Sequence, residues 1–339
     1  MKKKIGDILK FIIFIGIGIF FIYWFLIKLS PEQKQAIWQS FLGANYWWVA
    51  IAMICCLCSH LVRALRWQLL FKPLEQNPSI ANTFGAVIVA YMANLAFPRL
   101  GEVLRCAVLR TSERIPINQS IGTVVTERVT DVLLFLLIVA IGFLVMFTTV
   151  KDWIYNGLVD KVQGLPSMAL ILLICLVLLI GCVVVYKYFW HKLLHIKFFH
   201  KIDELLRGCL DGVKSVLRMG RKNTWLFVIY SLLIYLLYIL GGIIIFQAFD
   251  ETRGLTFEAA FVLYLFGSVG MGLSQGGLGV YPVLVQTALA IYGISLEVGT
   301  ACGWLLWGSQ QVIVITVGMV FLIYFSIQKK KSVANTPMS

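Results

Sequence analysis

Eight charged side chains lie in or at the edges of long apolar segments of this sequence. They are Arg63, Arg66, Arg99, Glu102, Arg105, Glu127, Arg128 and Asp131. A charge at the centre of a bilayer costs roughly 2.5 to 3.5 kcal/mol even on the most lenient insertion scale, so each group has to be paired, hydrated or close to the interface. Because the set holds five Arg and three carboxylates, about two guanidiniums stay available for an anion. The planar guanidinium fork suits a phosphate, to which it donates two parallel hydrogen bonds.

The spacing of these charges places them on shared helix faces, because residues three or four apart are neighbours on a helix surface. The groups are Arg63 with Arg66, Arg99 with Glu102 and Arg105, and Glu127 and Arg128 with Asp131. Acidic and basic side chains from different helices can therefore converge on one site. The alternative is a structural role, in which the charges cap helix ends and long side chains extend to the cytoplasmic interface. Arg63 and Arg66, at the edge of a span beside Trp67, suit this alternative best.

The elements that carry these charges belong to a membrane protein. The chain has 339 residues, of which 60% are hydrophobic and 13% charged, and its mean hydropathy is +0.88. This composition is far from that of a soluble domain, and no polar stretch exceeds about 40 residues, too few for an independent catalytic domain. The formal net charge of +13 comes from basic residues next to apolar segments. Membrane orientation and anionic headgroups explain it better than nucleic acid.

Six apolar segments are long enough to cross a bilayer. They cover about 11–27, 46–62, 119–147, 167–186, 224–248 and 300–327. Short cytoplasmic loops are rich in Lys and Arg, so the basic loop 187–222 and the two basic chain ends (MKKK and KKK) are predicted to be cytoplasmic. We expect one transmembrane domain over 1–328 and a disordered cytoplasmic tail at 329–339.

A further apolar segment, 81–97, does not cross completely if this loop is cytoplasmic. A full crossing there would place the loop 187–222 outside. We therefore expect residues 81–110 to form a re-entrant hairpin from the cytoplasm. Pro98 breaks it, because the proline ring constrains the preceding residue and removes an amide donor. Gly101 allows the returning arm to approach closely.

A second break interrupts residues 257–292, where Gly276, Gly277 and Gly279 precede Tyr281. This stretch is either a hairpin from the outside or two complete crossings, and the hairpin is favoured. Two broken hairpins of opposite orientation are typical of transporters with inverted repeats and a site near the midplane. Irregular backbone at that depth requires burial in protein or a water-filled cavity, so such a cavity is expected.

Familiar catalytic and cofactor motifs do not fit the chain. The letters GLSQG at 272–276 match a nucleophile elbow, but no His follows His200 to act as base. Neither a Walker A pattern nor a dinucleotide fingerprint occurs in the sequence. Cys56 and His60 share a helix face, yet no second Cys or His cluster lies nearby to complete a metal shell. We expect no cofactor, no metal and no disulfide framework, since most Cys residues lie in apolar runs.

Four stretches of the chain resemble, in this order, motifs of the flippase-like transmembrane family that forms the membrane half of lysylphosphatidylglycerol synthases. They are RALRW (63–67), NLAFPRLGEVLR (94–105), TERVTD (126–131) and GGLGVY (276–281). The resemblance covers nearly the whole chain. It departs at the glycine turn, where Gln275 stands in place of Pro and Pro282 in place of Glu.

The resemblance implies a polytopic domain with re-entrant helices around a lipid-sized cavity, which moves aminoacylated or otherwise modified phospholipids between leaflets. It assigns substrate binding to Arg66, Asn94, Arg99, Glu102, Arg105, Glu127, Arg128 and Asp131. It assigns the hairpin gates to Pro98, Gly101, Gly276, Gly277, Gly279 and Tyr281. Lipid synthesis is not expected, because the soluble aminoacyl-transferase half of those synthases has no counterpart in this sequence.

These features predict an all-α lipid translocator of the bacterial cytoplasmic membrane that is not an enzyme and uses no ATP. Its partners are phospholipids with an anionic or aminoacylated headgroup, whose phosphate engages Arg side chains. Two alternatives stay open. A membrane-embedded lipid-modifying enzyme would use Glu127 or Asp131 as base, and a non-transporting partner of a separate lipid synthase would dock through the loop 187–222. A homo-oligomer is compatible with each of them.

Overall fold

The computed structural model describes residues 29–97, 100–145 and 216–334, together with 16, 19, 20, 22, 23 and 25–27. Every regular element in this part of the chain is a helix, which confirms the all-α class. Three of the described helices are long and apolar enough to cross a membrane: Tyr46–Leu74, Arg221–Phe246 and Leu296–Gln328. The protein is therefore a multi-pass membrane protein.

The chain divides into two compact units. One consists of residues 1–125 and 216–339, and the other of residues 126–215. The helix α6 (Ile117–Val145) begins in the first unit and continues into the second. The predicted span 167–186 lies outside the described residues, as do most of the predicted span 11–27 and most of the loop 187–222.

After the short helix α2 (Pro31–Gly43), the chain contains two sets of four helices. In each set a long helix is followed by two short helices and then by another long one. The first set is α3 (Tyr46–Phe71), α4 (Ile80–Ala96), α5 (Leu100–Glu113) and α6. The second set is α10 (Arg221–Phe246), α11 (Phe257–Leu273), α12 (Val280–Ala290) and α13 (Leu296–Ala334). The long helices α3 and α10 have 26 residues each, and α4 and α11 have 17 each. The last helix, α13, extends into the segment predicted as a tail.

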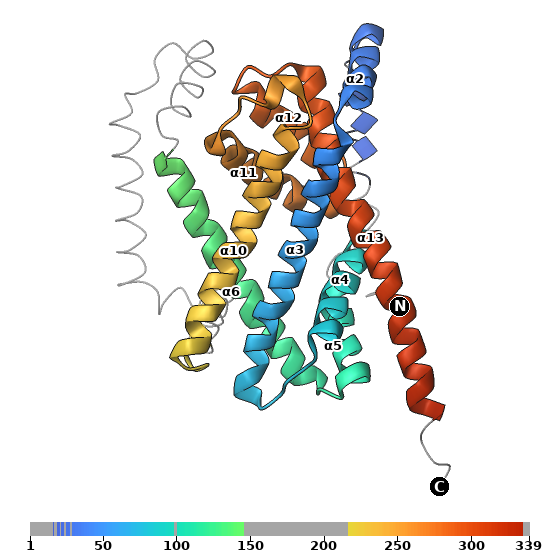
Figure 1. The fold of residues 1–339 in the computed structure, drawn as a ribbon, viewed down its shortest axis with the longest axis vertical. Helices are drawn as coiled ribbons and strands as arrows, with labels where there is room; N and C mark the ends of the chain where they lie inside the picture. The colour runs from blue at the N-terminus through green and yellow to red at the C-terminus, as the bar shows by residue number, and fades with distance from the viewer. Residues whose placement is uncertain are drawn as a thin grey trace, which may run out of the picture. The chain divides into compact units, whose positions relative to one another are not determined.

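The two long helices that begin these sets, α3 and α10, lie side by side and antiparallel (Figure 1). The Asn45 amide before α3 donates to the Ala248 carbonyl after α10 at 2.9 Å. At the opposite end, Lys72 Nζ donates to Asn223 Oδ1 at 3.4 Å. The two sets therefore start in opposite directions, which is the arrangement of an inverted repeat.

In each set the two short helices fold back on each other as a hairpin. The first hairpin is α4–α5 and the second is α11–α12, joined by the short 3-10 turn η3 (Gln275–Gly277). In Figure 1 the first hairpin lies toward the lower end of the long helices and the second toward the upper end. Their re-entrant orientation in a bilayer and the number of spans stay predictions.

Glycines let the paired helices approach closely. A Cβ on Gly101 of α5 would lie 2.1 Å from the Ala90 carbonyl oxygen of α4. A Cβ on Gly270 of α11 would lie 2.8 Å from Tyr281 Cα of α12. Neither position has room for a side chain, so both hairpins depend on the close backbone packing that small residues permit between membrane helices.

A carboxylate ties the open end of each hairpin. Glu113 Oε1 at the end of α5 accepts hydrogen bonds from Ser79 N (2.9 Å), Ser79 Oγ (2.6 Å) and Asn82 Nδ2 (2.7 Å) at the start of α4. Burial raises the pKa of Glu113, but these hydrogen bonds together lower it more, so it lies below its ordinary value. In the second hairpin, Glu251 Oε2 accepts from Ser295 Oγ at 2.8 Å.

The outer faces of the long helices are apolar. Trp47 on α3, Leu232 on α10 and Ile323 on α13 are 72%, 54% and 59% exposed. Such large exposed apolar side chains are unusual over a whole surface in water but suit contact with lipid tails.

Candidate functional site

Three arginines are buried among the helices of the first unit, and Arg66 is the most enclosed. It is 0% exposed, and its Nη1 donates to Ser231 Oγ of α10 at 3.2 Å. Its guanidinium carbon lies 5.4 Å from the centre of the Phe227 ring. A guanidinium over an aromatic face gains about 0.5 to 2 kcal/mol, with the larger values where water is excluded. The charge of Arg66 is thus held inside the protein and does not extend to an interface.

Arg63 lies one turn earlier on α3 and is also buried. Its Nη2 donates to the Tyr238 hydroxyl of α10 at 3.3 Å, and its guanidinium carbon lies 5.7 Å from the centre of the Tyr91 ring of α4. The His60 ring lies 4.5 Å from the same Tyr91 ring. Arg63 therefore links α3 to both the antiparallel partner helix and the first hairpin.

Arg105 brings a third buried guanidinium to α3 from the first hairpin. Its guanidinium carbon lies 4.6 Å from the centre of the Trp67 ring, and the residue is 3% exposed. Trp67 is fully buried, and its indole Nε1 donates to Thr123 Oγ1 at 2.9 Å. The indole thus presents its face to Arg105 while its polar edge is satisfied by a hydroxyl. This contact fixes α5 against α3.

The charged group predicted on α6 lies together along one face of that helix. Glu127 is fully buried, and Arg128 Nη2 lies 3.2 Å from Glu127 Oε1 and 3.8 Å from Asp131 Oδ2. One guanidinium therefore bridges both carboxylates. The Arg128 side chain is still 42% exposed, so this part of α6 presents a mixed charge and not a bare acidic patch.

The tips of the two hairpins meet each other. The Gln275 side-chain amide of η3 donates to the Asn94 carbonyl oxygen at the end of α4. A Cβ on Gly276 would lie 2.9 Å from Leu95 Cδ2, and the Gly276 carbonyl accepts from Trp307 Nε1 of α13 at 2.7 Å. The Asn94 and Gly276 carbonyls beside the two breaks are thus satisfied by protein, as irregular backbone at membrane depth requires.

The conformations of the two tips differ. In the first hairpin, Asn94 Oδ1 accepts from the Gly101 amide at 2.8 Å and so closes the tip with its own helices. In the second, Gly276, Gly277 and Gly279 have φ values of +59°, +78° and +73°. Side chains rarely adopt this left-handed region, so the glycine-rich sequence of η3 is what allows its tight turn.

The predicted site residues that the structure describes fall into three groups: the hairpin tips, the buried arginines of α3 and α5, and the charged residues Glu127, Arg128 and Asp131 on α6. The residues at or beside the meeting tips are Asn94, Gly101, Gly276, Gly277, Gly279 and Tyr281. Arg66 precedes Trp67 on α3, and Arg105 lies over the Trp67 ring. Glu102 is half-buried one turn before Arg105. Pro98 and Arg99 lie outside the described residues. Their roles as binding and gating residues stay predictions.

Three partners of the arginines and one residue of the tips are not among the site residues expected from the sequence. Ser231 and Tyr238 supply the hydroxyls, Trp67 supplies a ring face, and Gln275 joins the tips. The sequence contains a signal for Ser231, Tyr238 and Gln275. Each is a polar side chain inside an apolar span or at a glycine break, where it is costly unless it has a partner.

Comparison with known proteins agrees with the sequence motifs. The model of the family described as "Lysylphosphatidylglycerol synthase TM region" matches residues 8–323. A UPF0104 membrane protein of Methanocaldococcus jannaschii is 27% identical over 125 residues, which make up 34% of this chain and 37% of that protein. The match thus covers little more than a third of the relative's length. No solved structure matches the chain.

Proposed function

The chain belongs to the family of the lysylphosphatidylglycerol synthase transmembrane region, and on that premise we propose that it moves a phospholipid or modified phospholipid between the leaflets of the bacterial cytoplasmic membrane. The observation that carries the proposal is the contact between the tips of two oppositely placed hairpins. One of these hairpins carries the buried Arg105. Passage of a headgroup through a membrane domain requires a charged group that can bind it and a contact between helices that can open and close.

We assign the lipid phosphate to the arginines of α3 and α5. The Arg66 guanidinium now donates to a neutral hydroxyl, whereas a phosphate oxygen carries the opposite charge, and hydrogen bonds between opposite charges are shorter and stronger. A phosphate oxygen can therefore replace the Ser231 hydroxyl as the acceptor of Arg66. Every phospholipid carries this phosphate, and the guanidinium fork can hold two of its oxygens. On α6, Glu127, Arg128 and Asp131 stay candidate substrate-binding residues.

The hairpin tips are the gate in this proposal. The Gln275 amide and the Asn94 carbonyl form a single neutral hydrogen bond, which contributes about 1 kcal/mol. Separation of the tips therefore requires little free energy at this contact. The positive-φ glycines of η3 give the second tip a turn that can reform after each passage.

Lipid movement can be measured with the full chain in liposomes that carry a short-chain fluorescent phosphatidylglycerol. Albumin extracts the label from the outer leaflet only, so slow extraction of the inner pool reports translocation. We expect Arg105→Gln to move the label at least about tenfold more slowly, because a charge-assisted hydrogen bond is lost. The matched control is Arg110→Gln on the same helix, whose side chain is exposed. This variant is expected to keep the wild-type rate.

Two outcomes would contradict this function. One is a wild-type rate equal to that of protein-free liposomes, and the other is an equal rate for wild type and Arg105→Gln. Arg105→Lys separates transport from folding, because it keeps the buried charge and loses the fork; we expect it to elute as wild type and to move lipid slowly. Mass spectrometry of the same lipids tests the enzymatic alternative, which a new lipid product would favour.

A further inference from the structure

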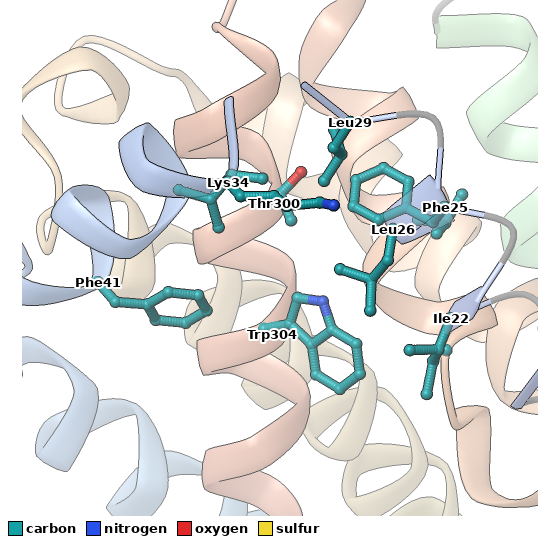
Figure 2. Close-up of a pocket in the computed structure, with 11 residues that line it drawn as sticks. Ile22, Phe25, Leu26, Leu29, Lys34, Phe41, Thr300 and Trp304 are labelled. Atoms are coloured by element: carbon teal, nitrogen blue, oxygen red, sulfur yellow. The ribbon is translucent and has the colours of Figure 1, made fainter. Parts of the chain in front are cut away.

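A pocket lies between α2, α13 and the segment that precedes α2, and its walls are mostly apolar. Its volume is about 220 Å³. Figure 2 shows Phe41 of α2, Trp304 of α13 and Leu26 of the preceding segment around it. An apolar cavity of roughly 150 Å³ is enough to bind benzene. This pocket can therefore hold part of an acyl chain, although not a whole phospholipid.

Two polar groups face the same side of this pocket. Thr300 of α13 is 3% exposed, and its hydroxyl has no hydrogen-bond partner among the described residues. Lys34 of α2 is exposed and makes no ion pair with any residue of the described ranges. Figure 2 shows the Lys34 amine and the Thr300 hydroxyl at one end, beyond the indole of Trp304. A buried hydroxyl left without a partner is unfavourable, so a ligand oxygen at this position would be favourable.

The helix α2 brings one basic and several apolar side chains to the pocket and its surroundings. Lys34, Ile37 and Phe41 all line the pocket and share one face, because they are spaced by three and four residues. Trp38 is 61% exposed and Leu42 60% exposed. Trp is enriched where headgroups meet acyl chains, and the single Lys of α2 lies on the same face as Ile37 and Phe41. The positive charge thus stands at the headgroup end of an apolar pocket.

We propose that this pocket binds one acyl chain of an anionic phospholipid. The Lys34 ammonium contacts the phosphate, the Thr300 hydroxyl donates to an ester carbonyl, and the chain packs against Trp304. This pocket is separate from the buried Arg63, Arg66 and Arg105, because its lining comes from α2, α12, α13 and the segment before α2. It also does not depend on lipid translocation. Gly279 and Val283 form part of its wall, so a bound chain touches the second hairpin beside its tip.

The test uses a photoactivatable lipid and the full chain in nanodiscs of phosphatidylcholine. A phosphatidylglycerol with a diazirine in one acyl chain is activated, and the labelled residues are mapped by mass spectrometry; a phosphatidylcholine with the same chain is the comparison. A Lys near a membrane surface attracts an anionic lipid by about 1 kcal/mol. We therefore expect the anionic probe to label Leu26, Val283 and Trp304 roughly fivefold more than the zwitterionic probe.

Three variants decide the assignment. Lys34→Gln is expected to remove the preference for phosphatidylglycerol, whereas Lys222→Gln, another exposed lysine, keeps it. Val283→Phe fills the pocket and lowers labelling by both probes to the level at the lipid-facing Leu232. Equal labelling by the two probes in the wild type, or an unchanged preference in Lys34→Gln, overturns the anionic lipid. Stronger labelling of the pocket by a diazirine fatty acid than by the phospholipid probe would overturn the proposal that a phospholipid is the ligand. Labelling of the wild-type pocket residues no higher than that of Leu232 would overturn the binding site itself.

Discussion

The two hairpins each consist of two short helices, but they differ in their charged residues and in the hydrogen bonds at their tips. The first carries Glu102 and Arg105 into the protein and closes its tip with its own Asn94. The second carries no charged residue between 259 and 292. Its tip closes on itself through the Ser274 hydroxyl, which donates to the Leu278 carbonyl at 3.0 Å, and it also bonds other elements through Gln275 and the Gly276 carbonyl. The first therefore combines charge with a self-supported frame. The second is an apolar element that is in addition hydrogen-bonded to α4 and α13 at its tip.

This difference suggests a division of labour in the proposed translocation. A binding group works best on a rigid element, because its geometry is then fixed before the ligand arrives. A gate needs discrete contacts that can be broken and remade at low cost. The first hairpin suits the former role and the second the latter, and their meeting point links the two.

The largest expected effect concerns the close packing of the first hairpin. In Gly101→Ala the new Cβ would lie 2.1 Å from the Ala90 carbonyl oxygen, so the helices must separate, at a cost of about 2 to 3 kcal/mol. The matched control is Gly272→Ala on α11, where a Cβ meets nothing within 4 Å and Ala is the better helix former. Thermal unfolding of the purified proteins should show a lower midpoint for the first and no loss for the second. Equal midpoints would contradict the rigid frame.

The tip contacts should give intermediate effects that differ between the hairpins. Asn94→Ala leaves the Gly101 amide without its acceptor, which costs about 1 to 2 kcal/mol. Trp307→Phe removes the hydrogen bond to the Gly276 carbonyl, which contributes about 1 kcal/mol. By hydrogen exchange, the first change is expected to speed exchange along the start of α5, and the second only in η3. Faster exchange of α5 in both variants would mean that the tips are not independently supported.

The smallest expected effect is a pH dependence at the open end of the first hairpin. The pKa of Glu113 is lowered in the folded protein, so its carboxylate stabilises the fold above the unfolded pKa of about 4.3, and this contribution disappears as pH falls through the lowered value. Thermal unfolding of wild type and Glu113→Gln should therefore differ at pH 7, by about 1 kcal/mol, and converge in acid. Ser79→Ala, which removes a donor, should narrow the difference. A difference in stability between wild type and Glu113→Gln that grows as the pH falls would contradict this prediction.

The sequence anticipates the features that depend on local backbone chemistry. As expected, α4 ends at Ala96 and α5 begins at Leu100, and η3 lies between α11 and α12, because Pro and Gly are poorly compatible with a continuous helix. The span predicted over 46–62 is too short, since α3 continues to Phe71. Its charged final turns stay helical because Arg63 and Arg66 find partners inside the protein and need no interface.

The partners themselves could not be predicted. Arg66 and Ser231 are 165 residues apart in the chain, and Gln275 and Asn94 are 181 apart. Such contacts follow from how the two sets of helices pack, and one-dimensional spacing rules reach only three or four residues along a helix. The full burial of Trp67 is of the same kind, because its neighbours Thr123 and Arg105 come from other helices.

The most direct test of the gate joins the two tips covalently. In a variant with the native cysteines replaced by Ala, Leu95→Cys and Gln275→Cys introduce one thiol on each of the two tips that meet, without changing a glycine of η3, and the reduced form of the same protein is its own control. Lipid movement is followed by albumin extraction, which leaves disulfides intact. We expect the oxidised protein to stop moving lipid and to recover when dithiothreitol is added. Transport by fully cross-linked protein at the rate of the reduced form would contradict a gate at the hairpin tips.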